Sequence, residues 1–238
     1  MAKAYHNIER VNEARTFINL GFTDYLAARI LLNNGLVLQG LCLASTSVEK
    51  YFKAILSLKE TVHRKHLNRD LRKAVRATDS ELYQSLNESF FLLLEKCYKL
   101  RYLDDLPNGF SVALIQYPSL AELDYSIEKI ESRFALYEDS RKLELGYQRM
   151  LNEKDSQLIE NNFLYSELEK KEFIESKESK VYCMRILPPP SRYLEMTYTA
   201  SKQPHDGDFL RELRVFHNPT MDNPKMGMDL PFPNKKFE

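Results

Sequence analysis

The chain has 238 residues, 43% of them hydrophobic and 29% charged, which is an ordinary balance for a globular protein with a buried core. Lys+Arg and Asp+Glu both number 34, so the chain as a whole has no net attraction to nucleic acid. There is no signal-peptide pattern, no apolar run near the ~20 residues of a membrane helix, and no metal-type cysteine spacing. We therefore expect a cytoplasmic protein without a membrane association, a metal or another cofactor.

The first hundred residues carry four helical patterns. Apolar residues at steps of three and four predict a helix over 8–32, ended by Asn33-Asn34-Gly35, and a second over 36–59. The short turn between them favours an antiparallel hairpin. A short basic helix is expected over 67–77, and a fourth helix, with caps among 78–81, continues to Leu100.

The second half of the chain has more varied patterns. Residues 110–117 predict a packed loop or, alternatively, a short strand. The heptad spacing from Leu120 to Tyr137 predicts a helix that either completes the core or forms a dimer seam. A weaker pattern predicts one helix kinked near Gly146, or two successive helices. Strands are expected over 181–187 and 193–199, and a third strand or a short helix over 209–216; so few strands must pack on the bundle or on a partner.

Several short motifs of the helical region resemble one known family. They are, in chain order, Ala44, Glu49-Lys50, Lys53-Ala54, His66-Leu67 and Leu100-Arg101-Tyr102. In this order they resemble the HEPN family (higher eukaryotes and prokaryotes nucleotide-binding domains) over residues 8–137. The resemblance implies a mainly α fold with an antiparallel helical bundle. We divide the chain into the bundle at 1–140, a long helical extension at 141–180, a short β-rich segment at 181–216 and an irregular tail at 217–238.

Two groups of residues in this region are candidates for binding phosphate. Arg69, Arg72 and Arg76 lie at i, i+3 and i+7 of the basic segment, which predicts a phosphate-binding face or, alternatively, a solvated surface helix. Lys53, four residues after Glu49, can hold a phosphate, while His66 serves as a hydrogen-bond acceptor or proton carrier. The alternative is a simple Glu49–Lys53 surface pair, with His66 capping the next helix.

The Arg101-Tyr102 pair bears on catalysis. The ribonuclease branch of the HEPN family has an Arg followed four to six residues later by a His, but no His follows Arg101 at that spacing, and Asp104 and Asp105 would repel phosphate. We therefore expect nucleotide or RNA binding without catalysis. The predicted binding residues are Glu49, Lys53, His66, Arg69, Arg72, Arg76, Arg101 and Tyr102.

Two other functions stay open at this point. One is a metal-independent ribonuclease that uses His66 or Tyr102 with Arg101 in an altered arrangement. The other is a protein-interaction scaffold formed by the heptad pattern and the C-terminal strands. The resemblance further implies a homodimer and a role in a defence, toxin–antitoxin or stress system, beside a nucleotidyltransferase or another protein partner.

Overall fold

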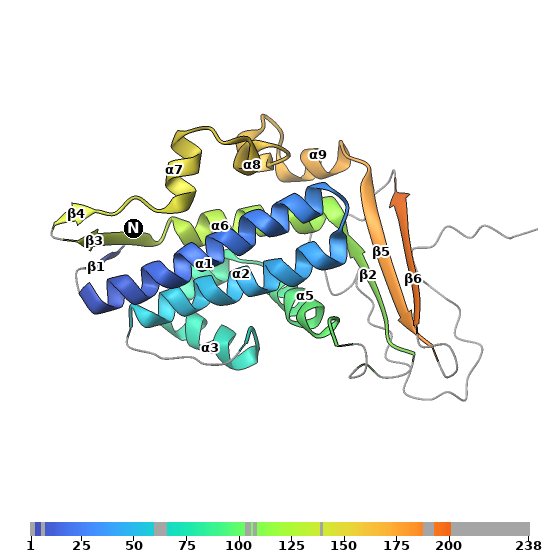
Figure 1. Cartoon of the computed structure of the whole chain (residues 1–238), viewed down its shortest axis with the longest axis horizontal. Coiled ribbons are helices and arrows are strands. Elements are labelled where there is room, and N and C mark those ends of the chain that lie inside the picture. The colour runs from blue at the N-terminus through green and yellow to red at the C-terminus, as the bar shows by residue number, and fades with distance from the viewer. Residues whose placement is uncertain are drawn as a thin grey trace, which may run out of the picture.

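The computed structural model describes residues 3–5, 8–59, 66–102, 106, 109–138, 140–187 and 193–200. The chain is mainly helical, as predicted, with a small three-stranded sheet at each end of the helical body (Figure 1). No helix in this described part has the length and apolar character that crossing a membrane requires. The strand or helix predicted over 209–216 and the tail at 217–238 lie outside the described residues.

The predicted helical hairpin is confirmed. Helices α1 (Ile8–Asn33) and α2 (Val37–Ser57) lie antiparallel, side by side, along the length of the molecule (Figure 1). The turn has a Schellman ending: Gly35 has a φ of 76°, its N–H donates to the Leu32 carbonyl at 2.9 Å, and the Leu36 N–H donates to the Leu31 carbonyl at 2.9 Å. The predicted stop signal therefore works through the left-handed conformation of a glycine.

The next helical region differs from the prediction in one respect. Helix α3 (Arg69–Thr78) is present as predicted and begins after an Asn68 cap, but the single helix predicted to reach Leu100 is two helices, α4 (Ser80–Ser85) and α5 (Glu88–Lys99). Leu86 adopts an extended backbone with a ψ of 152°, and the Asn87 side chain accepts from the Phe90 N–H at 3.3 Å. Asn87 thus starts a new helix inside a continuous apolar pattern.

The heptad pattern belongs to the core of the chain. Residues predicted as a packed loop or a short strand form strand β2 (Ser111–Ile115), so the strand alternative is confirmed. Helix α6 (Gln116–Glu131) follows β2 directly. Leu120, Leu123, Ile127 and Ile130 are fully buried within this one chain, so the core interpretation is confirmed and the prediction of a dimer seam is wrong. Phe134 and Tyr137, which continue the spacing, lie in strand β3 (Phe134–Glu138) rather than in the helix.

The segment 141–180 is helical in part, but the long helix predicted there, kinked near Gly146 or in two successive parts, is wrong. Strand β4 (Arg141–Lys142) is followed by short helices only: α7 (Gly146–Asn152), α8 (Ser156–Ile159), the 3-10 helix η2 (Phe163–Tyr165) and α9 (Lys170–Glu175). Lys154 and Asn161 have φ angles of 52° and 51°, a left-handed conformation that ends a right-handed helix. These short helices pack along α1 and α6 (Figure 1).

The two sheets join distant parts of the sequence. Strand β1 (Lys3–Tyr5) pairs in parallel with β3, which pairs antiparallel with β4. Strand β5 (Ser179–Ile186) lies between β2 and β6 (Tyr193–Ala200), and both pairings are antiparallel. The two predicted C-terminal strands are therefore confirmed; β5 packs against α2 and α6, whereas β6 pairs with β5 at the exposed edge of the sheet. The main hydrophobic core runs from Val11 to Ile186, across the predicted divisions at 140 and 180.

A buried polar cluster, the Arg29 cluster, fixes α8 against the bundle. It consists of Tyr25, Arg29 and Asp124, all fully buried. Arg29 pairs with Asp124 through Nη1, while its Nε donates to the Gln157 carbonyl at 3.1 Å and its Nη2 to the Glu160 carbonyl at 2.6 Å. The Tyr25 hydroxyl donates to Asp124 at 2.8 Å. Each nitrogen of the guanidinium therefore has an acceptor, which buried charge requires.

Candidate functional site

Side chains from α2, from the residues before α3 and from the end of α5 meet at one surface of the bundle. This α2–α5 cluster consists of Glu49, Lys53, His66, Tyr98, Arg101 and Tyr102. Five of the six are predicted site residues, and Tyr98 is the addition. Helix α2 supplies a nearly buried carboxylate, α5 supplies the partly buried Tyr98, and the residues just after α5 supply an exposed guanidinium and an exposed ring.

Glu49 organises the buried end of the cluster. Only 7% of this residue is exposed, and its Oε1 accepts from Lys53 Nζ at 2.7 Å. Its Oε2 accepts from the Leu67 N–H at 3.1 Å and lies 3.2 Å from His66 Nδ1. The predicted Glu49–Lys53 pair is therefore present, but the carboxylate also holds the chain at the start of α3 and orients the imidazole.

His66 and Tyr98 form the middle of the cluster. The Tyr98 hydroxyl lies 3.3 Å from His66 Nε2, and the two ring centroids are 4.7 Å apart at an interplanar angle of 31°. Both nitrogens of the imidazole thus face a polar group of the chain, a carboxylate on one side and a phenol on the other. The His66 side chain is still 65% exposed, so much of its surface is open to a ligand.

Arg101 forms the exposed end. Its guanidinium carbon lies 3.8 Å from the centre of the Tyr98 ring and 5.6 Å from that of Tyr102, and its Nε donates to the Tyr98 carbonyl at 3.3 Å. Among the described residues, no group accepts a hydrogen bond from its two terminal nitrogens. Stacking therefore holds the guanidinium in place while its outer edge keeps free donors, the edge that binds phosphate.

The three arginines of α3 do not share one environment. Arg69 and Arg76 are exposed, together with Lys73. Arg72 is only 6% exposed and pairs with Glu88 at 3.3 Å and with Glu95 at 3.0 Å, both on α5. Its position lies at the flank of the basic face, next to the buried Leu71, so its side chain reaches α5 and its charge is neutralised there.

The arrangement supports two kinds of chemistry. The free guanidinium edge and the exposed rings suit a phosphate and a base, while the carboxylate–imidazole–phenol series suits proton transfer. Tyr98 belongs to none of the sequence motifs; the signal for it is its position on the last turn of α5, three residues before Arg101. No group of three or more metal-ligating side chains occurs in the described part of the chain.

No family model, curated protein or solved structure matches this chain. The geometry of the α2–α5 cluster is therefore the basis on which its function can be inferred.

Proposed function

We propose that the chain is an HEPN-like nucleotide- or RNA-binding protein and that the α2–α5 cluster is its binding surface. The observation that carries the proposal is the position of Arg101, stacked on Tyr98 with no acceptor for its two terminal nitrogens among the described residues. A guanidinium in this position can bind a phosphate through two parallel hydrogen bonds. The exposed rings beside it suit the stacking of unpaired bases, which contributes roughly 1–3 kcal/mol per base.

The residues of the cluster take different parts in this proposal. Arg101 binds phosphate, and His66 and Tyr102 contact the base; Tyr102 is 52% exposed. Glu49 and Lys53 are positioning residues, because the charge of Lys53 is already paired. Arg69 and Arg76 extend the basic surface along α3, whereas Arg72 holds α3 on α5. A homodimer and a nucleotidyltransferase partner in a defence, toxin–antitoxin or stress system stay predictions from the family resemblance.

The test is the salt dependence of RNA binding, measured by fluorescence anisotropy with a labelled single-stranded RNA. Arg101→Ala is expected to weaken binding and to lower the slope of log K against log salt by about 0.7, the share of one phosphate contact on a single strand. Arg15→Ala, which removes an exposed arginine of α1, is the matched control and should change neither. Equal binding by both variants and the wild type would overturn the proposal.

A second function, metal-independent RNA cleavage, is favoured by the contact between Glu49 and His66. An imidazole that is oriented by a carboxylate, as His66 is by Glu49, can act as a general base. His66 would take the proton of the 2′-hydroxyl, and Arg101 would stabilise the charge of the phosphorane. In this mechanism His66, which precedes α3, takes the role of the histidine that the ribonuclease pattern places after Arg101.

Incubation of RNA with the protein in EDTA separates the two functions. Cleavage by the wild type and by Arg15→Ala, lost in both His66→Ala and Arg101→Ala, would establish the nuclease. Intact RNA with all four proteins, together with salt-sensitive binding by the wild type, would support binding without catalysis.

A further inference from the structure

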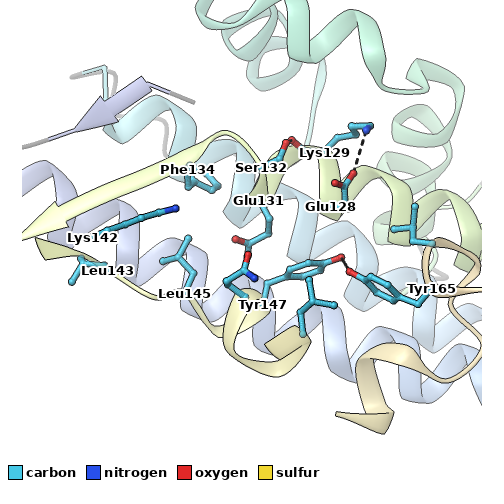
Figure 2. A pocket seen from close by; sticks show the side chains of 13 residues that line it. Glu128, Lys129, Glu131, Ser132, Phe134, Lys142, Leu143, Leu145, Tyr147 and Tyr165 are labelled. Atoms are coloured by element: carbon cyan, nitrogen blue, oxygen red, sulfur yellow. Dashed lines mark hydrogen bonds and ion pairs between the residues drawn. The ribbon is translucent and has the colours of Figure 1, made fainter. Parts of the chain in front are cut away.

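A pocket of about 390 Å³ lies apart from the α2–α5 cluster, between α6, β3, β4, α7 and η2 (Figure 2). Its volume lies within the range of small-molecule sites. No residue of the α2–α5 cluster lines it. It lies under the short elements of 141–165, the part of the chain that the sequence predicted least well.

Two carboxyl groups line this pocket: Glu128, whose Oε2 lies 3.3 Å from Lys129 Nζ, and the more deeply buried Glu131. Glu131 is 9% exposed, and its Oε1 accepts from the Tyr51 hydroxyl at 2.5 Å. Within the described residues its other oxygen has no hydrogen-bond partner, and Figure 2 shows the side chain descending from α6 among the lining residues. Burial raises the pKa of Glu131 to about 7. The pocket therefore presents an acceptor that no described group of the chain satisfies.

A cation stands across the pocket from this carboxyl group. Lys142 on β4 is exposed and forms no ion pair with any described residue, and its side chain extends towards Glu131 in Figure 2. The other lysine of the lining, Lys129, pairs with Glu128 at 3.3 Å. Lys142 and Glu131 are not within ion-pair distance of each other, so the pocket keeps one acidic and one basic group apart.

Apolar and aromatic side chains form about half of the walls of this pocket. Phe134, Leu143, Leu145, Leu151 and Leu164 contribute to them. The hydroxyls of Tyr147 and Tyr165 lie 2.8 Å apart and hydrogen-bond to each other, which leaves their rings as further wall surface (Figure 2). A ligand of this pocket should therefore have an apolar body between two opposite charges or beside them.

We propose that this pocket binds a small zwitterion of the amino-acid class with an apolar side chain. Its ammonium group donates to the free oxygen of Glu131, and its carboxylate pairs with Lys142. Its side chain lies against the leucines and aromatic rings. Both protein groups thereby gain the partner that the described chain does not give them, which is how buried and partly buried charges become favourable.

The experiment is titration calorimetry with two matched series of probes. The first is phenylalanine, 2-phenylethylamine and 3-phenylpropanoate; the second is leucine, 3-methylbutylamine and 4-methylpentanoate. Within each series the zwitterion should bind most tightly, the amine about tenfold more weakly and the acid not measurably, because a buried carboxylate rejects an anion. Absence of binding in both series would overturn the proposal, as would equal binding of the acid and the zwitterion.

Variants locate the site. Glu131→Gln retains an acceptor for Tyr51 and should weaken binding of the zwitterion by about tenfold or more. Lys142→Ala should lower the affinity for the zwitterion to that for the amine, and it should leave the affinity for the amine unchanged. Lys171→Ala, an exposed lysine of α9, is the control and should have no effect. Binding that is unchanged in Glu131→Gln would contradict the assignment. RNA binding should be the same in all three variants, which keeps this test separate from that of the proposed function.

Discussion

The Arg29 cluster and the α2–α5 cluster contain the same kinds of side chain, an arginine, a tyrosine and a carboxylate, but in different environments. Arg29 and Asp124 are fully buried, and each guanidinium nitrogen has an acceptor in the chain. Arg101 lies at the surface, and its terminal nitrogens have no acceptor among the described residues. The comparison indicates that burial and unused donors, rather than residue type, separate an arginine that stabilises the fold from one that can bind a ligand.

The largest expected effect is on the buried side of this comparison. Arg29→Ala leaves Asp124 as an uncompensated buried charge and should lower the free energy of unfolding by about 3–5 kcal/mol. Urea denaturation followed by circular dichroism measures it, with Arg15→Ala as the control. A loss below about 1 kcal/mol, the usual value of a surface pair, would mean that burial does not distinguish the two arginines.

Glu131 is a buried carboxyl group without a cation among the described residues, so the stability of the folded chain should fall as the pH rises. The folded pKa of Glu131, about 7, lies above its ordinary value of 4.5, so the folded chain binds more protons between these values and stability falls as pH rises through them. The loss is on the order of 3 kcal/mol. Glu131→Gln should remove this decline and be more stable than the wild type above about pH 7. The prediction would be contradicted if the free energy of unfolding, measured by urea denaturation, depended on pH in the same way in the wild type and in Glu131→Gln.

Two arginines of one helix sharpen the comparison further. Arg72→Ala leaves Glu88 and Glu95 without their cation and should cost about 1–3 kcal/mol of stability. Arg76→Ala should change stability by no more than about 0.5 kcal/mol. Only Arg76→Ala should reduce the salt dependence of RNA binding without loss of structure. The two variants are matched in residue type and helix, so the reverse pattern of stability losses would refute the distinction.

The smallest effect on stability is expected at Arg101. Arg101→Lys keeps the charge but loses the planar group stacked on Tyr98, so stability should change by less than about 0.5 kcal/mol. RNA binding should nevertheless fall, because a lysine cannot form the two parallel hydrogen bonds to phosphate. Anisotropy and urea denaturation on the same samples measure both quantities. Full binding by Arg101→Lys would mean that only the charge matters.

Local sequence signals predicted the parts of the fold that depend on local interactions. The Gly35 turn and the apolar stripes of α1 and α2 each depend on neighbours a few residues away. The structure brings Glu49, Lys53, His66 and Arg101, which these motifs named as site residues, to one surface. That these motifs indicate an HEPN domain stays a prediction.

Features that depend on distant contacts or on rare backbone conformations were predicted poorly. The left-handed conformation of Lys154 and Asn161 breaks the extension, but neither residue type requires it. The burial of Arg72 depends on two glutamates of another helix. The Glu131 pocket combines α6 with elements whose own periodicity is weak, so its polar groups could not be associated from spacing alone.

The pairing of β2 with β5 has a consequence for the order in which the chain folds. Strand β2 at Ser111–Ile115 meets its one partner in the described sheet only at Ser179–Ile186, so everything from α6 to α9 is synthesised in between. The α1–α2 hairpin, by contrast, closes across a three-residue turn as soon as both helices have left the ribosome. Pairings of long sequence separation form slowly, and an unpaired strand edge is prone to association. During synthesis, the hydrogen-bonding edge of β2 therefore stays open to association with other chains until β5 has left the ribosome.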